Sequence, residues 1–168
     1  MARNMSDSLP KLLKPVDKTN VFGMSKFTYK GNFKEGENGI SLINANFSRY
    51  FRSKIELNIQ DISLNIYEAI EWCDSSVFKF LQREKEEFFL AHLFNLLKNQ
   101  PDDKTAGPLL THCTSNLFLI TGTNGVCRIV DVGFSGKAGF YEAGWFLHAH
   151  SMRNPCLYLP GSRVFLVN

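Results

Sequence analysis

The sequence predicts an α+β domain in which an antiparallel β-meander, formed by the C-terminal half, packs against one long helix and one or two shorter helices. Apolar residues recur at helical spacing between residues 75 and 100, whereas the chain after residue 101 consists of strand-like segments separated by turn signals. Helical and strand segments are thus segregated along the chain instead of alternating. Such segregation is typical of α+β domains.

The long helix is expected to begin after Asp74, a good N-cap, and to end at Gln100-Pro101. Its length of about 25 residues would correspond to roughly 37 Å. A shorter helix is expected over residues 66–72. The apolar stripe of the long helix comprises Phe78, Leu81, Phe88, Phe89, His92, Leu93 and Leu96.

The meander is expected to begin with two strands, 116–121 and 126–134, on either side of Asn124-Gly125, which is the strongest hairpin dipeptide. A third strand is predicted over 140–152, and one or two more follow residue 154, bent at Pro160-Gly161. In the N-terminal half, alternation predicts strands near residues 24–29 and 54–60. Residues 40–54 fit a strand or a helix.

Length and composition indicate one globular domain. The chain has 168 residues, of which 44% are hydrophobic and 21% charged, and its 15 phenylalanines suit a well-filled core. Residues 1–20 contain two prolines and few large apolar side chains, so a flexible basic N-terminal arm is expected there. The single α+β domain would then span residues 21–168.

The net charge of +3 is unevenly distributed. Residues 1–30 contain six basic and two acidic residues, which leaves thirteen basic and fourteen acidic residues in the rest of the chain. A basic arm can contact phosphates. These lysines are widely spaced, however, and the sequence favours a solvated tail.

The sequence also indicates a compartment. No apolar run reaches the roughly 18–20 residues that span a bilayer, and residues 1–20 lack a hydrophobic signal region. The four cysteines have no C-x-x-C spacing, which favours thiols over bridges. We therefore expect a cytoplasmic protein without a membrane partner.

His148 and His150 are the sharpest candidate site. On a strand they would share one face with Phe146 and Met152, and two imidazoles on one face can bind a single zinc ion. Further ligands would have to come from His112, Cys113, Cys127, Cys156 or Asp131. The alternative is that both histidines only pack on the sheet. Zinc is therefore possible but is not the favoured interpretation.

A cysteine nucleophile is a second possibility. Cys113 is adjacent to His112, and Cys127 could lie opposite His148, with Asp131 orienting the imidazole. No cysteine begins a helix, and no glycine-rich oxyanion loop adjoins one. The glycine-rich segment 122–139 also lacks a phosphate-binding motif. The sequence thus leaves enzymatic activity open and favours a non-enzymatic role.

Residues 46–54 interleave aromatic with basic side chains, as in proteins that bind single-stranded nucleic acids. An amphipathic segment, with aromatics in the core and arginines in water, explains the same pattern and is favoured. Arg49, Tyr50 and Arg52 would then be available to a protein partner, since such residues are enriched in interface hot spots.

The sequence therefore favours a small protein-binding protein, by analogy of size and class an inhibitor or immunity-type protein that neutralises a toxin by covering its surface. One alternative is a small zinc-dependent hydrolase that uses His148 and His150. Another is a protein that binds single-stranded nucleic acid through residues 46–54 and the basic arm; a protein partner is favoured over nucleic acid. The sequence gives no indication of the oligomeric state.

Overall fold

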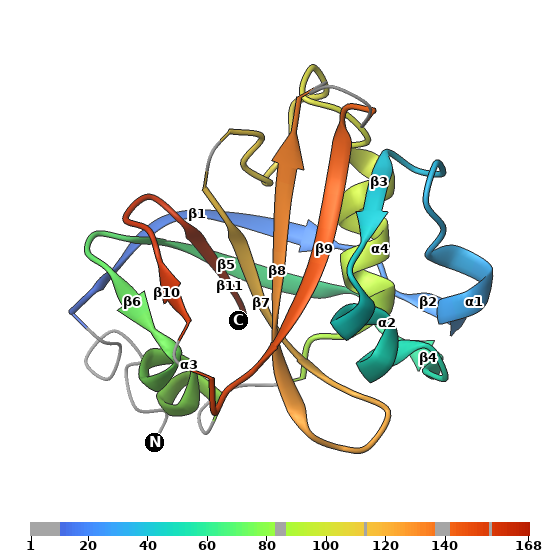
Figure 1. Cartoon of the computed structure of the whole chain (residues 1–168), viewed down its shortest axis with the longest axis horizontal. Coiled ribbons are helices and arrows are strands. Elements are labelled where there is room, and N and C mark those ends of the chain that lie inside the picture. The colour runs from blue at the N-terminus through green and yellow to red at the C-terminus, as the bar shows by residue number, and fades with distance from the viewer. Residues whose placement is uncertain (1–10, 83–86, 113, 137–141, 155) are drawn as a thin grey trace.

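A computed structural model describes residues 11–82, 87–112, 114–136, 142–154 and 156–168. The fold is mixed α+β and is built on a seven-stranded sheet (Figure 1). Across the sheet the order is β1 (Leu13–Val21), β5 (Ile62–Ala69), β11 (Arg163–Val167), β7 (Asn116–Thr121), β8 (Cys127–Ser135), β9 (Gly144–Ser151) and β3 (Ile40–Ile43).

The strand pairing differs in part from a simple meander. β7, β8 and β9 pair antiparallel in chain order. The final strand β11 does not continue this series, because it lies between β5 and β7 and runs parallel to β7. The four residues Val164–Val167 are all buried, as expected for a strand covered on both faces. At the other edge, β3 runs parallel to β9.

The β7–β8 turn contains Gly125, which has a φ of +74°, whereas Asn124 does not adopt a positive φ. Gly125 N donates to Gly122 O at 3.0 Å, and Gly122 N donates to Val126 O at 2.9 Å. The hairpin at Asn124-Gly125 is thus confirmed. The turn differs from a type I′ turn, which needs positive φ at both central residues.

Gly125→Val is expected to destabilise the protein by about 1–2 kcal/mol, because the left-handed backbone brings Cβ too close to the carbonyl oxygen. Gly136→Val is a matched control, since a Cβ on either glycine would meet no atom of the described residues within 4 Å and, of the two, only Gly125 has a positive φ. Urea unfolding of both variants measures the difference. Equal midpoints would contradict the assigned turn.

Four helices occur in the described residues: α1 (Tyr29–Asn32), α2 (Ala45–Phe51), α3 (Ser75–Gln82) and α4 (Leu90–Asn99). The predicted helix of about 25 residues is therefore wrong. Asp74 Oδ1 does accept a hydrogen bond from Ser76 N at 2.8 Å, and α4 does end at Gln100. Between α3 and α4, however, Phe88 is extended and forms a bridge to Ile120.

The short helix expected over 66–72 is also wrong, because residues 62–69 form β5. The ambiguous segment 40–54 contains both a strand, β3, and a helix, α2. Two small ribbons complete the fold: β2 (Met24–Thr28) pairs with β4 (Ile55–Ile59), and β6 (Cys73–Asp74) pairs with β10 (Leu157–Tyr158).

The sheet separates two apolar clusters. The larger one includes residues of α2, α4 and the β2–β4 ribbon, and the smaller one includes residues of α3 and the β6–β10 ribbon. Figure 1 shows these two groups at opposite ends of the molecule. The face of β8 and β9 next to the β6–β10 ribbon carries the candidate site.

The start of the domain differs from the expected boundary at residue 20. β1 pairs antiparallel with β5 from Leu13↔Ala69 to Val21↔Ile62, so residues 13–20 belong to the sheet. Residues 1–10 of the expected flexible arm lie outside the described residues. Among the described helices, none has the length and apolar character needed to span a membrane.

Candidate functional site

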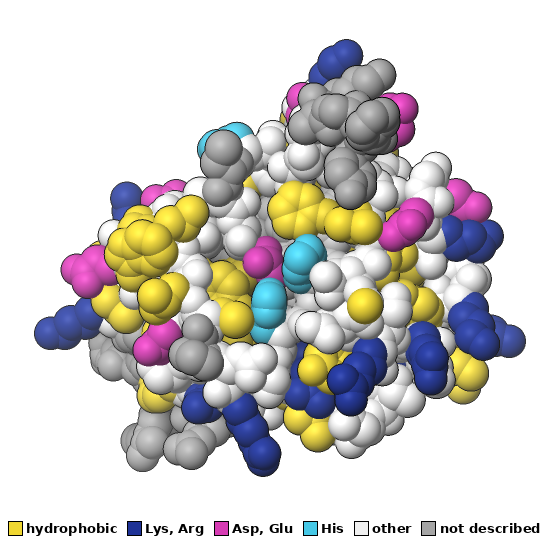
Figure 2. Space-filling view, in the orientation of Figure 1, with side chains coloured by type: hydrophobic (Ala, Val, Ile, Leu, Met, Phe, Trp, Pro, Cys, Tyr) yellow, Lys and Arg dark blue, Asp and Glu magenta, His cyan; other side chains and the backbone are white. Residues whose placement is uncertain are grey.

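His148 and His150 lie on one face of β9, as strand alternation predicts. Both are half-buried, while Trp145, Leu147 and Ala149 point into the larger apolar cluster. The two imidazole ring centroids are 6.1 Å apart. Figure 2 shows two histidine side chains next to an acidic side chain on this face of the molecule.

Asp131 of β8 is the acidic neighbour, and the strand register places it opposite His148. Its Oδ2 lies 4.0 Å from His150 Nε2. Its Oδ1 is buried and has no hydrogen-bond partner among the described residues. Burial raises the pKa of Asp131, and the side chain of Ser115 and then the charges of His150 and His148 oppose that rise. Burial also lowers the pKa of His150, which Asp131 opposes.

The β6–β10 ribbon supplies the other neighbours of His150. Cys156 Sγ lies 3.6 Å from His150 Nδ1, and the Tyr158 ring centroid lies 6.4 Å from that of His150. Tyr158 is only 4% exposed, and its hydroxyl has no hydrogen-bond partner in the described part of the chain. Burial, then the charges of Asp131 and Cys156, raise the pKa of Tyr158. Asp131, His150, Cys156 and Tyr158 are called the His150 cluster below.

The geometry of the His150 cluster bears on metal binding. Asp131 lies near Nε2 of the imidazole, and Cys156 lies near Nδ1. One ion bound to a single ring nitrogen therefore cannot also be bound by both of these side chains. Across the described residues, no three or more His, Cys, Asp or Glu side chains are placed to hold one ion. Cys113, one of the expected ligands, lies outside those residues.

Asp131→Asn is expected to raise the urea midpoint at pH 8. The pKa of Asp131 is raised in the folded protein, so folding favours the protonated carboxyl group. The stability that this group contributes is complete below its unfolded pKa of about 3.9, and it is lost as the pH rises through the folded pKa and the buried carboxylate becomes charged. The stabilising effect of the variant should therefore vanish near pH 4. The exposed Asp103→Asn is the control; an equal response of both variants would argue against a buried carboxylate.

The three predicted partner-binding residues lie on or next to α2. Arg49 and Arg52 are exposed, whereas Tyr50 is half-buried. The Arg128 guanidinium lies 4.0 Å from the Tyr50 ring centroid, and Tyr50 O accepts hydrogen bonds from Thr123. Tyr50 thus anchors the β7–β8 hairpin, and the two arginines remain accessible.

Residues 46–54 show the amphipathic arrangement that the sequence favoured. Phe47 and Phe51 are fully buried in the larger apolar cluster and pack together, with their ring centroids 5.0 Å apart. Neither ring is available to stack on a nucleic-acid base. This removes the main feature that suggested binding of single-stranded nucleic acid.

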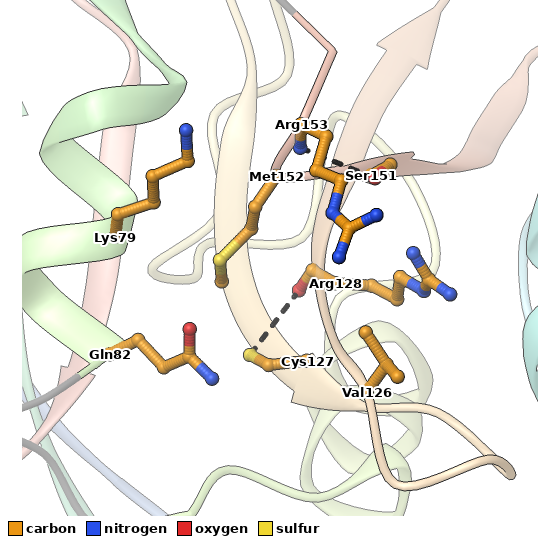
Figure 3. Close-up of a pocket in the computed structure, with 8 residues that line it drawn as sticks. All are labelled: Lys79, Gln82, Val126, Cys127, Arg128, Ser151, Met152 and Arg153. Carbon is orange, nitrogen blue, oxygen red and sulfur yellow. Dashed lines mark hydrogen bonds between the residues drawn. The ribbon is translucent and has the colours of Figure 1, made fainter.

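A pocket of about 420 Å³ lies between α3 and the ends of β8 and β9 (Figure 3). Figure 3 shows Cys127 among the residues that line it, with Sγ directed at Arg128 O. Burial is the main cause that raises the pKa of Cys127 to about 11, so this thiol stays protonated at neutral pH. That argues against Cys127 as a nucleophile. The pocket is lined by Lys79, Gln82, Val126, Cys127, Arg128, Ser151, Met152 and Arg153.

The outer face of the β6–β10 ribbon is apolar and exposed. Tyr158 is paired with Cys73, and both are buried on the inner face. The alternate residues Leu157 and Leu159 are 66% and 43% exposed, and Trp72, which precedes β6, is 58% exposed. With Ile70, at 49% exposed, these residues are called the ribbon patch.

Sequence reasoning missed two features of this region. It included Cys156 only as a possible zinc ligand, and it assigned no role to Tyr158 or Trp72. Alternation over residues 156–159 could have indicated a short strand, with Cys156 and Tyr158 on one face and Leu157 and Leu159 on the other.

Comparison of the chain with protein-family models, curated proteins and solved structures finds no match.

Proposed function

We propose that this chain is a cytoplasmic protein-binding protein that docks on a partner protein through the ribbon patch and blocks it, as an inhibitor or immunity-type protein does. The exposure of Trp72 beside Leu157 and Leu159 carries the proposal. Tryptophan is enriched in binding hot spots, and adjacent exposed apolar side chains mark interaction sites. The described cysteines 73, 127 and 156 are free thiols, which suits a reducing compartment.

The rim of the ribbon patch indicates the chemistry of the partner. Glu71 and Asp74 are exposed beside the patch. Hydrogen bonds from Ser76 lower the pKa of Asp74, so its carboxylate is charged at neutral pH. A two-fold dimer through the patch would bring the carboxylates of both copies close together. The better match is a different protein with an apolar groove flanked by lysine or arginine.

The ribbon patch is proposed ahead of the surface of Arg49, Tyr50 and Arg52. Tyr50 is held under Arg128 by its packing in the hairpin, so it cannot enter a partner's pocket without leaving that contact. Arg49 and Arg52 offer charge without an exposed aromatic anchor. Rim charges of this kind affect association rates more than affinity.

The test places a photo-cross-linking amino acid at position 72 in cells that express the full chain. Position 57 is the matched control, because Leu57 is 60% exposed on β4 and lies outside the ribbon patch. We expect one protein adduct from position 72 and none of that protein from position 57. The purified partner should then lose at least about tenfold in affinity for Trp72→Ser, as for other hot spots, and lose its activity when the wild-type chain binds.

Three results would overturn the proposal. Equal adducts from both positions would show that the contact is not specific to the ribbon patch. A second copy of this chain as the adduct would make the patch a dimer interface. A nucleic-acid adduct from position 72 would replace the protein partner with a different class of ligand.

A further inference from the structure

We propose that Cys156, His150 and Asp131 form a nucleophile–base–carboxylate triad that reacts with an activated acyl compound such as an ester. Cys156 Sγ lies 3.6 Å from His150 Nδ1, and His150 Nε2 lies 4.0 Å from Asp131 Oδ2. The thiol and the carboxylate thus lie at different nitrogens of one imidazole. This order is what transfer of a proton from a thiol to an oriented base requires. The inference does not rest on the proposed docking function.

The protonation states favour this role for His150. Burial lowers the pKa of His150, so the imidazole is neutral at neutral pH and can accept a proton. After it accepts the proton, the imidazolium lies beside Asp131, whose unpartnered Oδ1 is buried within the same region. The separation of 4.0 Å would shorten once the pair is charged, as catalytic contacts commonly do.

The surroundings contain a further unpaired group. Tyr158 is 4% exposed, and its hydroxyl lacks a partner in the described ranges. Cys156 is near enough for its charge to raise the pKa of Tyr158. A protonated phenol at this position can donate a hydrogen bond to an oxyanion. The contact of Tyr158 with Phe78 is made by the ring, so the fold does not depend on a hydrogen bond from the Tyr158 hydroxyl.

The reaction balances as an acyl transfer to sulfur followed by hydrolysis. The Cys156 thiol proton passes to His150 Nδ1 while Sγ bonds to the acyl carbonyl carbon. The bond from that carbon to the leaving oxygen breaks, and the leaving group takes the proton from His150. Water then attacks the thioester with His150 as the base. The carboxylic acid leaves, and the Cys156 thiol is restored.

The test uses the full chain with p-nitrophenyl acetate as the probe, followed by acid quenching and peptide mapping of the acetylated cysteine. The chain contains its own controls. Cys73 is fully buried, and burial is the main cause that raises the pKa of Cys127 to about 11. At pH 7 we expect acetyl-Cys156 to form first. His150→Gln should lower that rate by at least about tenfold, in line with general base catalysis.

Cys127→Ser is the matched variant and should leave the rate at Cys156 unchanged. Acetylation of Cys156 no faster than that of Cys127, or an unchanged rate in His150→Gln, would overturn the triad. If a variant does not fold, the wild-type map still decides between Cys156 and the other thiols. Loss of partner binding in Trp72→Ser with acetylation retained would separate this activity from the docking function.

Discussion

Trp145→Ala is expected to lower the free energy of unfolding by about 3–5 kcal/mol, the range for large-to-small changes of buried aromatic residues. The Trp145 side chain is fully buried, and its Nε1 donates a hydrogen bond to Gln100 O at 2.7 Å. Its ring packs edge-on against Phe134, with ring centroids 4.9 Å apart. Because Trp145 lies on β9, its loss also loosens the strand that positions His148 and His150.

The stability loss in Trp145→Ala is to be compared with the losses in two further variants. Trp145→Phe keeps most of the apolar volume and loses the hydrogen bond to Gln100 O, so a loss of about 1–2 kcal/mol is expected. Trp72→Ala should change stability by less than about 0.5 kcal/mol, because Trp72 is 58% exposed. Urea unfolding followed by far-UV circular dichroism measures all three. A loss in Trp145→Ala no larger than in Trp72→Ala would contradict the assigned packing.

Local pattern was sufficient to predict the parts of the site that depend on strand geometry. Alternation along β9 places His148 and His150 on one face, whatever the rest of the chain does. The Asn124-Gly125 turn predicts the β7–β8 hairpin, and Asp131 was recognised as a possible partner of the histidines. These features depend on neighbours in sequence or on a single tight turn.

The remaining features depend on pairing between distant segments. The position of Trp72 next to the segment of Leu157 and Leu159 follows from the β6–β10 pairing, which joins segments more than 80 residues apart with only two residues per strand. Alternation in so short a strand can indicate which side chains share a face, but it does not reveal which distant segment the strand pairs with. The position of β11 between β5 and β7 is equally non-local.

The predicted long helix shows how tertiary contacts override a helical pattern. The polar and charged block 82–87 interrupts the apolar stripe, but Leu81 and Phe88 on either side of it keep the i, i+7 spacing of a single helix, so the phase of the pattern alone does not reveal the break between α3 and α4. Phe88 leaves the helical path and stacks on Phe118, with ring centroids 5.0 Å apart. A new helix start then needs acceptors for its first amides. Glu56 of β4 supplies them.

Glu56→Ala is expected to destabilise the protein by about 2–4 kcal/mol, because two buried N–H groups at the start of α4 lose their acceptor. Glu56 is 4% exposed; its Oε1 accepts from Leu90 N at 3.1 Å, and its Oε2 accepts from Ala91 N at 2.8 Å.

Glu56→Gln separates the hydrogen bonds from the charge. The amide keeps one acceptor oxygen and turns an NH2 group toward the other backbone N–H, so an intermediate loss is expected. Burial is the largest cause that raises the pKa of Glu56; if this cost of the buried charge dominated, the glutamine variant would instead be more stable than wild type. Glu37→Ala, which breaks an exposed 3.3 Å ion pair with Lys34, should change stability by less than about 1 kcal/mol. Urea unfolding gives the three values, and hydrogen exchange at Leu90 and Ala91 locates the effect. Exchange that speeds up at these two amides in Glu56→Ala, and not in Glu37→Ala, would identify a contact from a distant strand as the reason why α4 begins at Leu90.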